Sequence, residues 1–170
     1  TPKPAWLGVG TLNVNGVRNK GTEVRRLVEK SNIGILALQE TRLKATDNEL
    51  RIPGYHCVSS CVENGTHGAR GVALLVRDSL QARSVELDSP WSVFVRCWDE
   101  PEQPWVVGSV YLPRGKDTTS TPVARVVQQL RKAQATNPGI PIVVMGDWNR
   151  TEIEVESLLR EVDKRARGKE

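Results

Sequence analysis

The chain has 170 residues, of which 38% are hydrophobic and 26% charged, values typical of a single globular domain spanning residues 1–170. No run of about 18 apolar residues occurs, so the sequence predicts no membrane-spanning helix and no membrane partner. The net charge of +4 permits contact with nucleic acid without demonstrating it. The three cysteines are an odd number, which argues against a disulfide framework and predicts a reducing, intracellular location.

Apolar runs bounded by turn residues predict most of the secondary structure. Strands are expected at residues 7–14, 33–38, 55–61, 71–77, 92–98, 105–112 and 142–145. Helices are expected where Thr22 precedes an apolar stripe, where Thr121 precedes Pro122, and where Thr151 and Glu154 form a capping box. Because several strands follow one another between the helices, the order favours sheets packed on each other with the helices outside.

Four polar clusters lie where predicted strands end. They are residues 13–16, 39–41, 111–113 and 146–149. Each cluster alone has an ordinary explanation as a turn, a helix cap or core filling, but strand ends can deliver their side chains to one rim of a layered fold. Carboxylates and amides at such a rim suit Mg²⁺, and phosphodiester cleavage needs a cation of this kind. The carboxylates of Glu40 and Asp147 should therefore lie within ~12 Å of each other.

A zinc site is a weaker alternative. His56, Cys57, Cys61 and His67 supply the right atom types, and the two cysteines are four residues apart in a predicted strand, so they point to one face. Small buried thiols are the preferred interpretation of these cysteines.

The four clusters, taken in order, resemble the motifs of the endonuclease/exonuclease/phosphatase family. Residues 11–18 resemble its first motif, and residues 35–41 its second, which supplies a metal-binding glutamate. Residues 109–113 are similar to the strand that carries its active-site tyrosine, and residues 143–149 to its Gly-Asp-x-Asn motif. Within the family, residues 70–75 are most similar to the endonucleases of LINE-type (non-LTR) retrotransposons.

This resemblance implies a four-layer αββα sandwich and assigns roles to five residues. Glu40 would hold Mg²⁺ (or Mn²⁺), with Asn13 beside it as the second metal-site residue. Tyr111 would hydrogen-bond a phosphate oxygen, Asp147 would position or activate the attacking water, and Asn149 would bind phosphate.

Further expectations come from the resemblance. Gln39 would support Glu40 from behind, and Asn15 occupies a position where some relatives carry an Asp. Family members continue through further strands to an Asp-His motif that this sequence does not contain, so the second sheet is expected to be incomplete. An open sheet edge would favour self-association. The chain is expected to bind Mg²⁺ weakly and, without the histidine, to nick DNA poorly or not at all.

The leading functional hypothesis is a Mg²⁺-dependent DNA endonuclease domain that nicks target DNA for retrotransposition. Its partners would be DNA and a reverse transcriptase in the parent polyprotein, and its location would be nuclear. Two alternatives stay open: a non-catalytic remnant that binds nucleic acid or protein, and an apurinic-site endonuclease or another phosphodiesterase of the family.

Overall fold

The computed structural model describes residues 8–44, 50–60, 70–85, 89–115 and 121–167, with side chains up to residue 163. Its eight strands are β1 (Gly8–Asn13), β2 (Ile33–Gln39), β3 (Tyr55–Ser60), β4 (Val72–Arg77), β5 (Gln81–Val85), β6 (Ser92–Trp98), β7 (Trp105–Tyr111) and β8 (Ile142–Asp147). Its three helices are α1 (Gly21–Lys30), α2 (Thr121–Thr136) and α3 (Glu152–Arg167). None of these helices is both long and apolar enough to cross a membrane.

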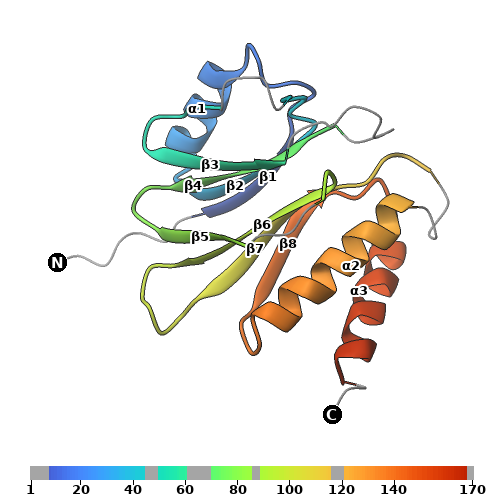
Figure 1. The fold of residues 1–170 in the computed structure, drawn as a ribbon. Coiled ribbons are helices and arrows are strands. Elements are labelled where there is room, and N and C mark those ends of the chain that lie inside the picture. The colour runs from blue at the N-terminus through green and yellow to red at the C-terminus, as the bar shows by residue number, and fades with distance from the viewer. Residues whose placement is uncertain (1–7, 45–49, 61–69, 86–88, 116–120, 168–170) are drawn as a thin grey trace.

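The strands form two four-stranded sheets that pack face to face (Figure 1). The first sheet has the order β1-β2-β4-β3 and the second the order β5-β6-β7-β8, so each sheet is built from one consecutive part of the chain. Helix α1 lies outside the first sheet, and helices α2 and α3 lie outside the second. The αββα sandwich expected from the resemblance is therefore confirmed.

Three apolar clusters separate the four layers. The outer two pack α1 on the first sheet and α2 with α3 on the second. The central cluster joins the two sheets through residues that alternate with the outward-facing ones, such as Ile35 and Leu74 from the first sheet and Val95 and Val107 from the second. Since β2 and β4 are covered on both faces, they consist of nearly continuous apolar residues.

One local prediction was wrong, one strand was not predicted, and one prediction is confirmed. Helix α1 begins at Gly21 with Lys20 at its N-cap, so Thr22 lies inside the helix instead of capping it. Strand β5 was not predicted at all. The capping box of α3 is present, because the Thr151 N–H donates to Glu154 Oε2 at 2.7 Å and the Glu154 N–H donates to Thr151 Oγ1 at 3.4 Å.

Strands β1 and β8 are the outer strands of their sheets, and they lie against each other on one side of the sandwich. Both carry apolar side chains that stay exposed: Val9 is 50% exposed and Val143 is 38% exposed. Their register places these side chains on the inner faces, opposite Ile35 and Val107 respectively. Self-association through the open edge of the second sheet stays a prediction.

The thiol of Cys97 is expected to resist alkylation in the folded protein. Cys97 is fully buried between the sheets, and burial raises its pKa from 9.0 to about 12, so almost no nucleophilic thiolate forms near pH 8. We expect iodoacetamide to leave Cys97 unlabelled in native protein and to label it in denaturant, as measured by peptide mass spectrometry. Labelling of native Cys97 as fast as in denaturant would contradict the burial seen here.

Candidate active site

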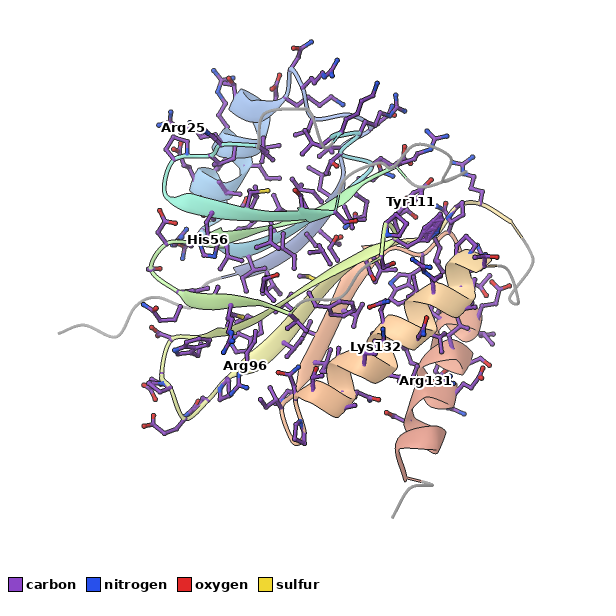
Figure 2. The ribbon with its side chains drawn as sticks, in the orientation of Figure 1. Arg25, His56, Arg96, Tyr111, Arg131 and Lys132 are labelled. Atoms are coloured by element: carbon purple, nitrogen blue, oxygen red, sulfur yellow. The ribbon has the colours of Figure 1, made fainter. Side chains whose placement is uncertain are left out.

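The ends of four strands bring the predicted clusters to one rim of the sandwich. Strands β1 and β2 run parallel and end in register at Asn13 and Gln39, and β7 and β8 run parallel and end at Tyr111 and Asp147. Each sheet therefore contributes two neighbouring carboxyl-terminal strand ends. Tyr111 lies at this end of the second sheet (Figure 2).

One amide group connects the two sheets at the rim. The Nδ2 atom of Asn13 donates to Glu40 Oε1 at 2.9 Å and to Asp147 Oδ2 at 2.9 Å. The two carboxylate oxygens are therefore no more than twice that distance apart, well within the expected range. The Oδ1 atom of Asn13 accepts from the Asn15 backbone N–H at 3.0 Å, which orients the amide.

Two arginines that sequence reasoning did not identify flank Glu40. The Nη1 atom of Arg70 lies 3.3 Å from Glu40 Oε2, and the Nη2 atom of Arg42 lies 3.8 Å from the same oxygen. Arg42 also donates to Asn15 Oδ1. Both guanidinium groups are about half exposed, so they add positive charge to the rim that a phosphate can reach.

Tyr111 is the buried member of the site. Burial raises the pKa of its phenol, the Glu40 and Asp147 carboxylates raise it further, and Arg70 lowers it. Hydrogen bonding with Glu40 adds to the raised pKa, so the phenol stays protonated near neutral pH and can donate. A shallow depression of about 420 Å³ opens beside it, lined by Glu40, Arg70 and Arg114 among others. A second depression of about 420 Å³ lies beside Asn13 and Asp147.

Backbone strain is concentrated at this rim. Among the described residues, five that are not glycine have positive φ, and four of them are site residues: Asn15 (46°), Glu40 (53°), Arg42 (55°) and Asn149 (46°). Such conformations each cost on the order of 1–3 kcal/mol and persist only where surrounding contacts impose them. At Glu40 these contacts are backbone bonds: the Gly16 N–H donates to Glu40 O at 2.7 Å, and the Thr41 N–H donates to Gly71 O at 3.2 Å.

Two predicted residues make contacts other than the expected ones. The side chain of Gln39 does not bond Glu40; its Nε2 atom donates to Ser109 Oγ at 3.1 Å, and its Oε1 atom accepts from Thr11, so it joins the two sheets. The Nδ2 atom of Asn149 donates to Leu112 O at 2.7 Å and holds the end of β8 against β7. The phosphate-binding role of Asn149 stays a prediction.

The donor set fits a hydrated Mg²⁺ ion. Two carboxylates from different sheets face one amide nitrogen, which stands where a cation between them would lie. Mg²⁺ needs only one or two protein carboxylates, because waters and substrate phosphates complete its shell. Within the described ranges no group of three or more His, Cys, Asp and Glu side chains gathers to hold a metal. Of the alternative zinc ligands, Cys61 and His67 lie outside those ranges, and His56 faces Asp78 at 3.5 Å.

A model of the endonuclease/exonuclease/phosphatase family matches residues 10–163 of the sequence. The chain belongs to this family. No curated protein matches the sequence.

Several solved structures share the fold of this family member. The endonuclease domain of TRAS1, a telomere-specific non-LTR retrotransposon, is 15% identical with a TM-score of 0.67, and the match covers 89% of this chain and 70% of that one. The AP endonuclease LMAP from Leishmania major is 17% identical with a TM-score of 0.66, covering 91% and 65%. A 3′ phosphatase from Neisseria bound to a product DNA hairpin is 24% identical with a TM-score of 0.54, covering 82% and 56%. The chain thus spans 56–70% of the lengths of these proteins.

Above pH 10, the stability of this family member should fall more steeply with pH than the stability of a variant that lacks the Tyr111 phenol. Because the folded-state pKa of Tyr111 is raised above the unfolded value of about 10, its contribution is complete below pH 10 and is lost as the pH rises through the folded pKa. We expect Tyr111→Phe to flatten the decline of Tm between pH 9 and 11, as measured by circular dichroism. Parallel declines in both proteins would show that the phenol is not perturbed.

Proposed function

We propose that this domain hydrolyses DNA phosphodiester bonds with Mg²⁺ (or Mn²⁺) and nicks target DNA for retrotransposition. The observation that carries the proposal is the Asn13 amide, which lies 2.9 Å from the carboxylates of both Glu40 and Asp147. Family membership supports the reaction class, and the similarity to the TRAS1 endonuclease domain supports a retrotransposon origin. Such an origin implies a reverse transcriptase as partner and a nuclear site of action.

The side chains around this amide have different roles in phosphodiester cleavage. The protonated Tyr111 phenol donates a hydrogen bond to a phosphate oxygen, and the Arg70 guanidinium offsets the charge that develops on the phosphate. The Asp147 carboxylate orients a water and accepts its proton, since its Oδ2 atom faces the rim and its Oδ1 atom accepts from the Asn149 N–H at 3.2 Å.

Glu40 would hold the metal ion, with Asn13 beside it. When bound, the ion neutralises phosphate charge and orients the reacting oxygens. In this structure Asn13 turns its Nδ2 atom toward the carboxylates, so binding the ion through its oxygen requires the amide to rotate by half a turn and release the Asn15 N–H. Arg70 and Arg42 then hold the remaining Glu40 oxygen in place.

Cleavage at apurinic sites is the second candidate, supported by the similarity to the Leishmania major AP endonuclease. The two functions differ in what the rim must accept. A target-DNA endonuclease cuts intact duplex, whereas an apurinic endonuclease requires a missing base. Duplexes that differ only by one abasic-site analogue therefore separate the two, because an apurinic enzyme cleaves only the damaged duplex.

Nicking of supercoiled plasmid tests the proposed function. We expect relaxed circles to accumulate with Mg²⁺ or Mn²⁺ and not with EDTA, and isothermal titration calorimetry to detect weak Mg²⁺ binding that Glu40→Gln removes. A protein that binds Mg²⁺ and DNA but never cleaves would instead support the non-catalytic alternative. Cleavage that persists in EDTA would overturn the role of the metal.

A further inference from the structure

The outer face of the second sheet changes character where helix α2 ends. Val85 and Phe94 lie opposite each other on β5 and β6, and both pack into the apolar cluster beneath α2. The next outward-facing pair is Arg83 and Arg96, followed by Gln81 and Trp98. The last residue of α2, Thr136, borders this part of the sheet. Gln81 and Arg83 are exposed, and Arg96 and Trp98 are partly exposed.

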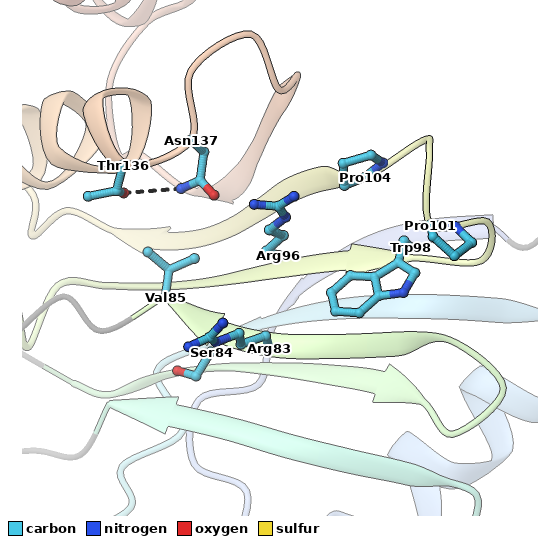
Figure 3. Close-up of a pocket in the computed structure, with 9 residues that line it drawn as sticks. All are labelled: Arg83, Ser84, Val85, Arg96, Trp98, Pro101, Pro104, Thr136 and Asn137. Carbon is cyan, nitrogen blue, oxygen red and sulfur yellow. Dashed lines mark hydrogen bonds between the residues drawn. The ribbon is translucent and has the colours of Figure 1, made fainter.

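A hollow of about 580 Å³ lies over this part of the sheet (Figure 3). Its lining includes Arg83, Arg96, Trp98, Pro104 and Asn137. Strand β6 runs antiparallel to β7, so Trp98 is at the end of the second sheet that lies opposite the rim carrying the candidate active site. The hollow is therefore separate from that site.

The two arginines are paired across the strands, and neither forms an ion pair with a carboxylate among the described residues, although Glu102 lines a neighbouring hollow together with Arg96. Like charges directly opposite in an antiparallel pair destabilise a sheet, so this arrangement favours an added anion. No hydrogen bond joins either guanidinium group to the described carboxyl end of α2, where several carbonyls already have donors of their own. Asn137 Nδ2 donates to Ala133 O at 2.9 Å, and Thr136 Oγ1 donates to Lys132 O at 2.9 Å.

We propose that this hollow binds one strand of nucleic acid, with a phosphate held between Arg83 and Arg96 and a base stacked on Trp98. Guanidinium groups match phosphate geometry, and aromatic side chains stack on any base. Asp99 and Glu100 follow Trp98 directly and limit the basic surface to the arginine pair. A surface this narrow fits a single strand, because a duplex presents two phosphate backbones.

Binding of a fluorescein-labelled oligothymidylate, roughly eight to twelve nucleotides long, tests the proposal by anisotropy in EDTA. We expect Arg83→Gln with Arg96→Gln to weaken binding about tenfold and to reduce the dependence on salt, and Trp98→Leu to weaken it about tenfold. The matched control is Arg26→Gln with Arg125→Gln, which removes two exposed arginines elsewhere and should leave affinity nearly unchanged. An abasic strand of the same length has no base to stack on Trp98. Its affinity for the wild-type protein should therefore equal the affinity of the oligothymidylate for Trp98→Leu.

Photocrosslinking locates the contact independently of affinity. An oligonucleotide containing 5-bromodeoxyuridine should crosslink to the peptide that contains Trp98, and circular dichroism should show that all variants are folded. Equal loss of affinity in both double variants would overturn the proposal, because it would show that only net charge matters. Crosslinks confined to other peptides, or a duplex that competes better than the single strand, would overturn it as well.

Discussion

Replacement of Glu40 by Gln is expected to reduce plasmid nicking roughly 10²- to 10³-fold while leaving DNA binding intact. The substitution keeps the size of the side chain and its contact with Asn13, but it removes the negative charge that faces the proposed metal position and the Arg70 guanidinium. Because this charge acts on the reaction and not on the DNA backbone, the loss should fall on kcat. DNA affinity should stay equal or rise, since Arg70 is released toward phosphate.

The control for this change is Glu29→Gln, which removes one acid from an exposed ion pair with Arg25 on helix α1. Exposed pairs of this kind contribute little, so nicking and stability should be nearly unchanged. Initial rates of plasmid nicking and anisotropy with a labelled duplex provide the two readouts. If Glu40→Gln nicks plasmid as fast as the wild type, Glu40 has no role in the reaction. If Glu29→Gln loses as much activity as Glu40→Gln, the loss is not specific to Glu40.

Replacement of Gly146 by Ala is expected to destabilise the fold by about 3 kcal/mol or more. A Cβ atom at Gly146 would lie 2.0 Å from Val110 O and 2.8 Å from Val110 C, both backbone atoms of the neighbouring strand. A flexible side chain can relieve such a contact by changing its rotamer, but the backbone of a paired strand cannot. Strands β7 and β8 must therefore separate locally. For a domain of this size, Tm should fall by about 6–12 °C.

The same substitution should also reduce nicking, because Gly146 precedes Asp147 and pairs with the residue before Tyr111. Gly21→Ala is the matched control. A Cβ atom there meets nothing within 4 Å, and Gly21 is the first residue of helix α1. That change should be neutral or stabilising by up to about 1 kcal/mol. Thermal unfolding that does not distinguish the two alanine variants would show that β7 and β8 can move apart at little cost.

The strands that support the site could be predicted because burial dictates their composition. Strand β2 is covered on both faces, so its apolar run is evident in the sequence. Strand β5, with Arg83 and Ser84 at its centre, has no apolar pattern that would predict it, because it is a mostly exposed outer strand. It is held in the sheet by its pairing with β6. Its conformation is therefore decided by tertiary structure and not by local propensity.

The site could be predicted only to the level of which strand ends meet. Polar residues after apolar runs identified Glu40 and Asp147 as candidates, and the fold brings them together. The ion pair of Arg70 with Glu40 depends on how the end of β2 lies beside the start of β4, and the bond from Gln39 to Ser109 depends on the register between the sheets. Neither relation leaves a periodic signal in the chain.

The division of the chain into two successive sheets would link stability to binding of the proposed metal ion. Asn13 and Glu40, which would hold the ion, belong to the first part of the chain, and the Asp147 carboxylate beside them belongs to the second. The charge of a bound ion would therefore oppose separation of the two parts. An ion that binds only the folded protein raises the free energy of unfolding by about 2.7 kcal/mol when its concentration is one hundred times its Kd. The rise of Tm with Mg²⁺ concentration would therefore measure how tightly the folded protein binds the ion.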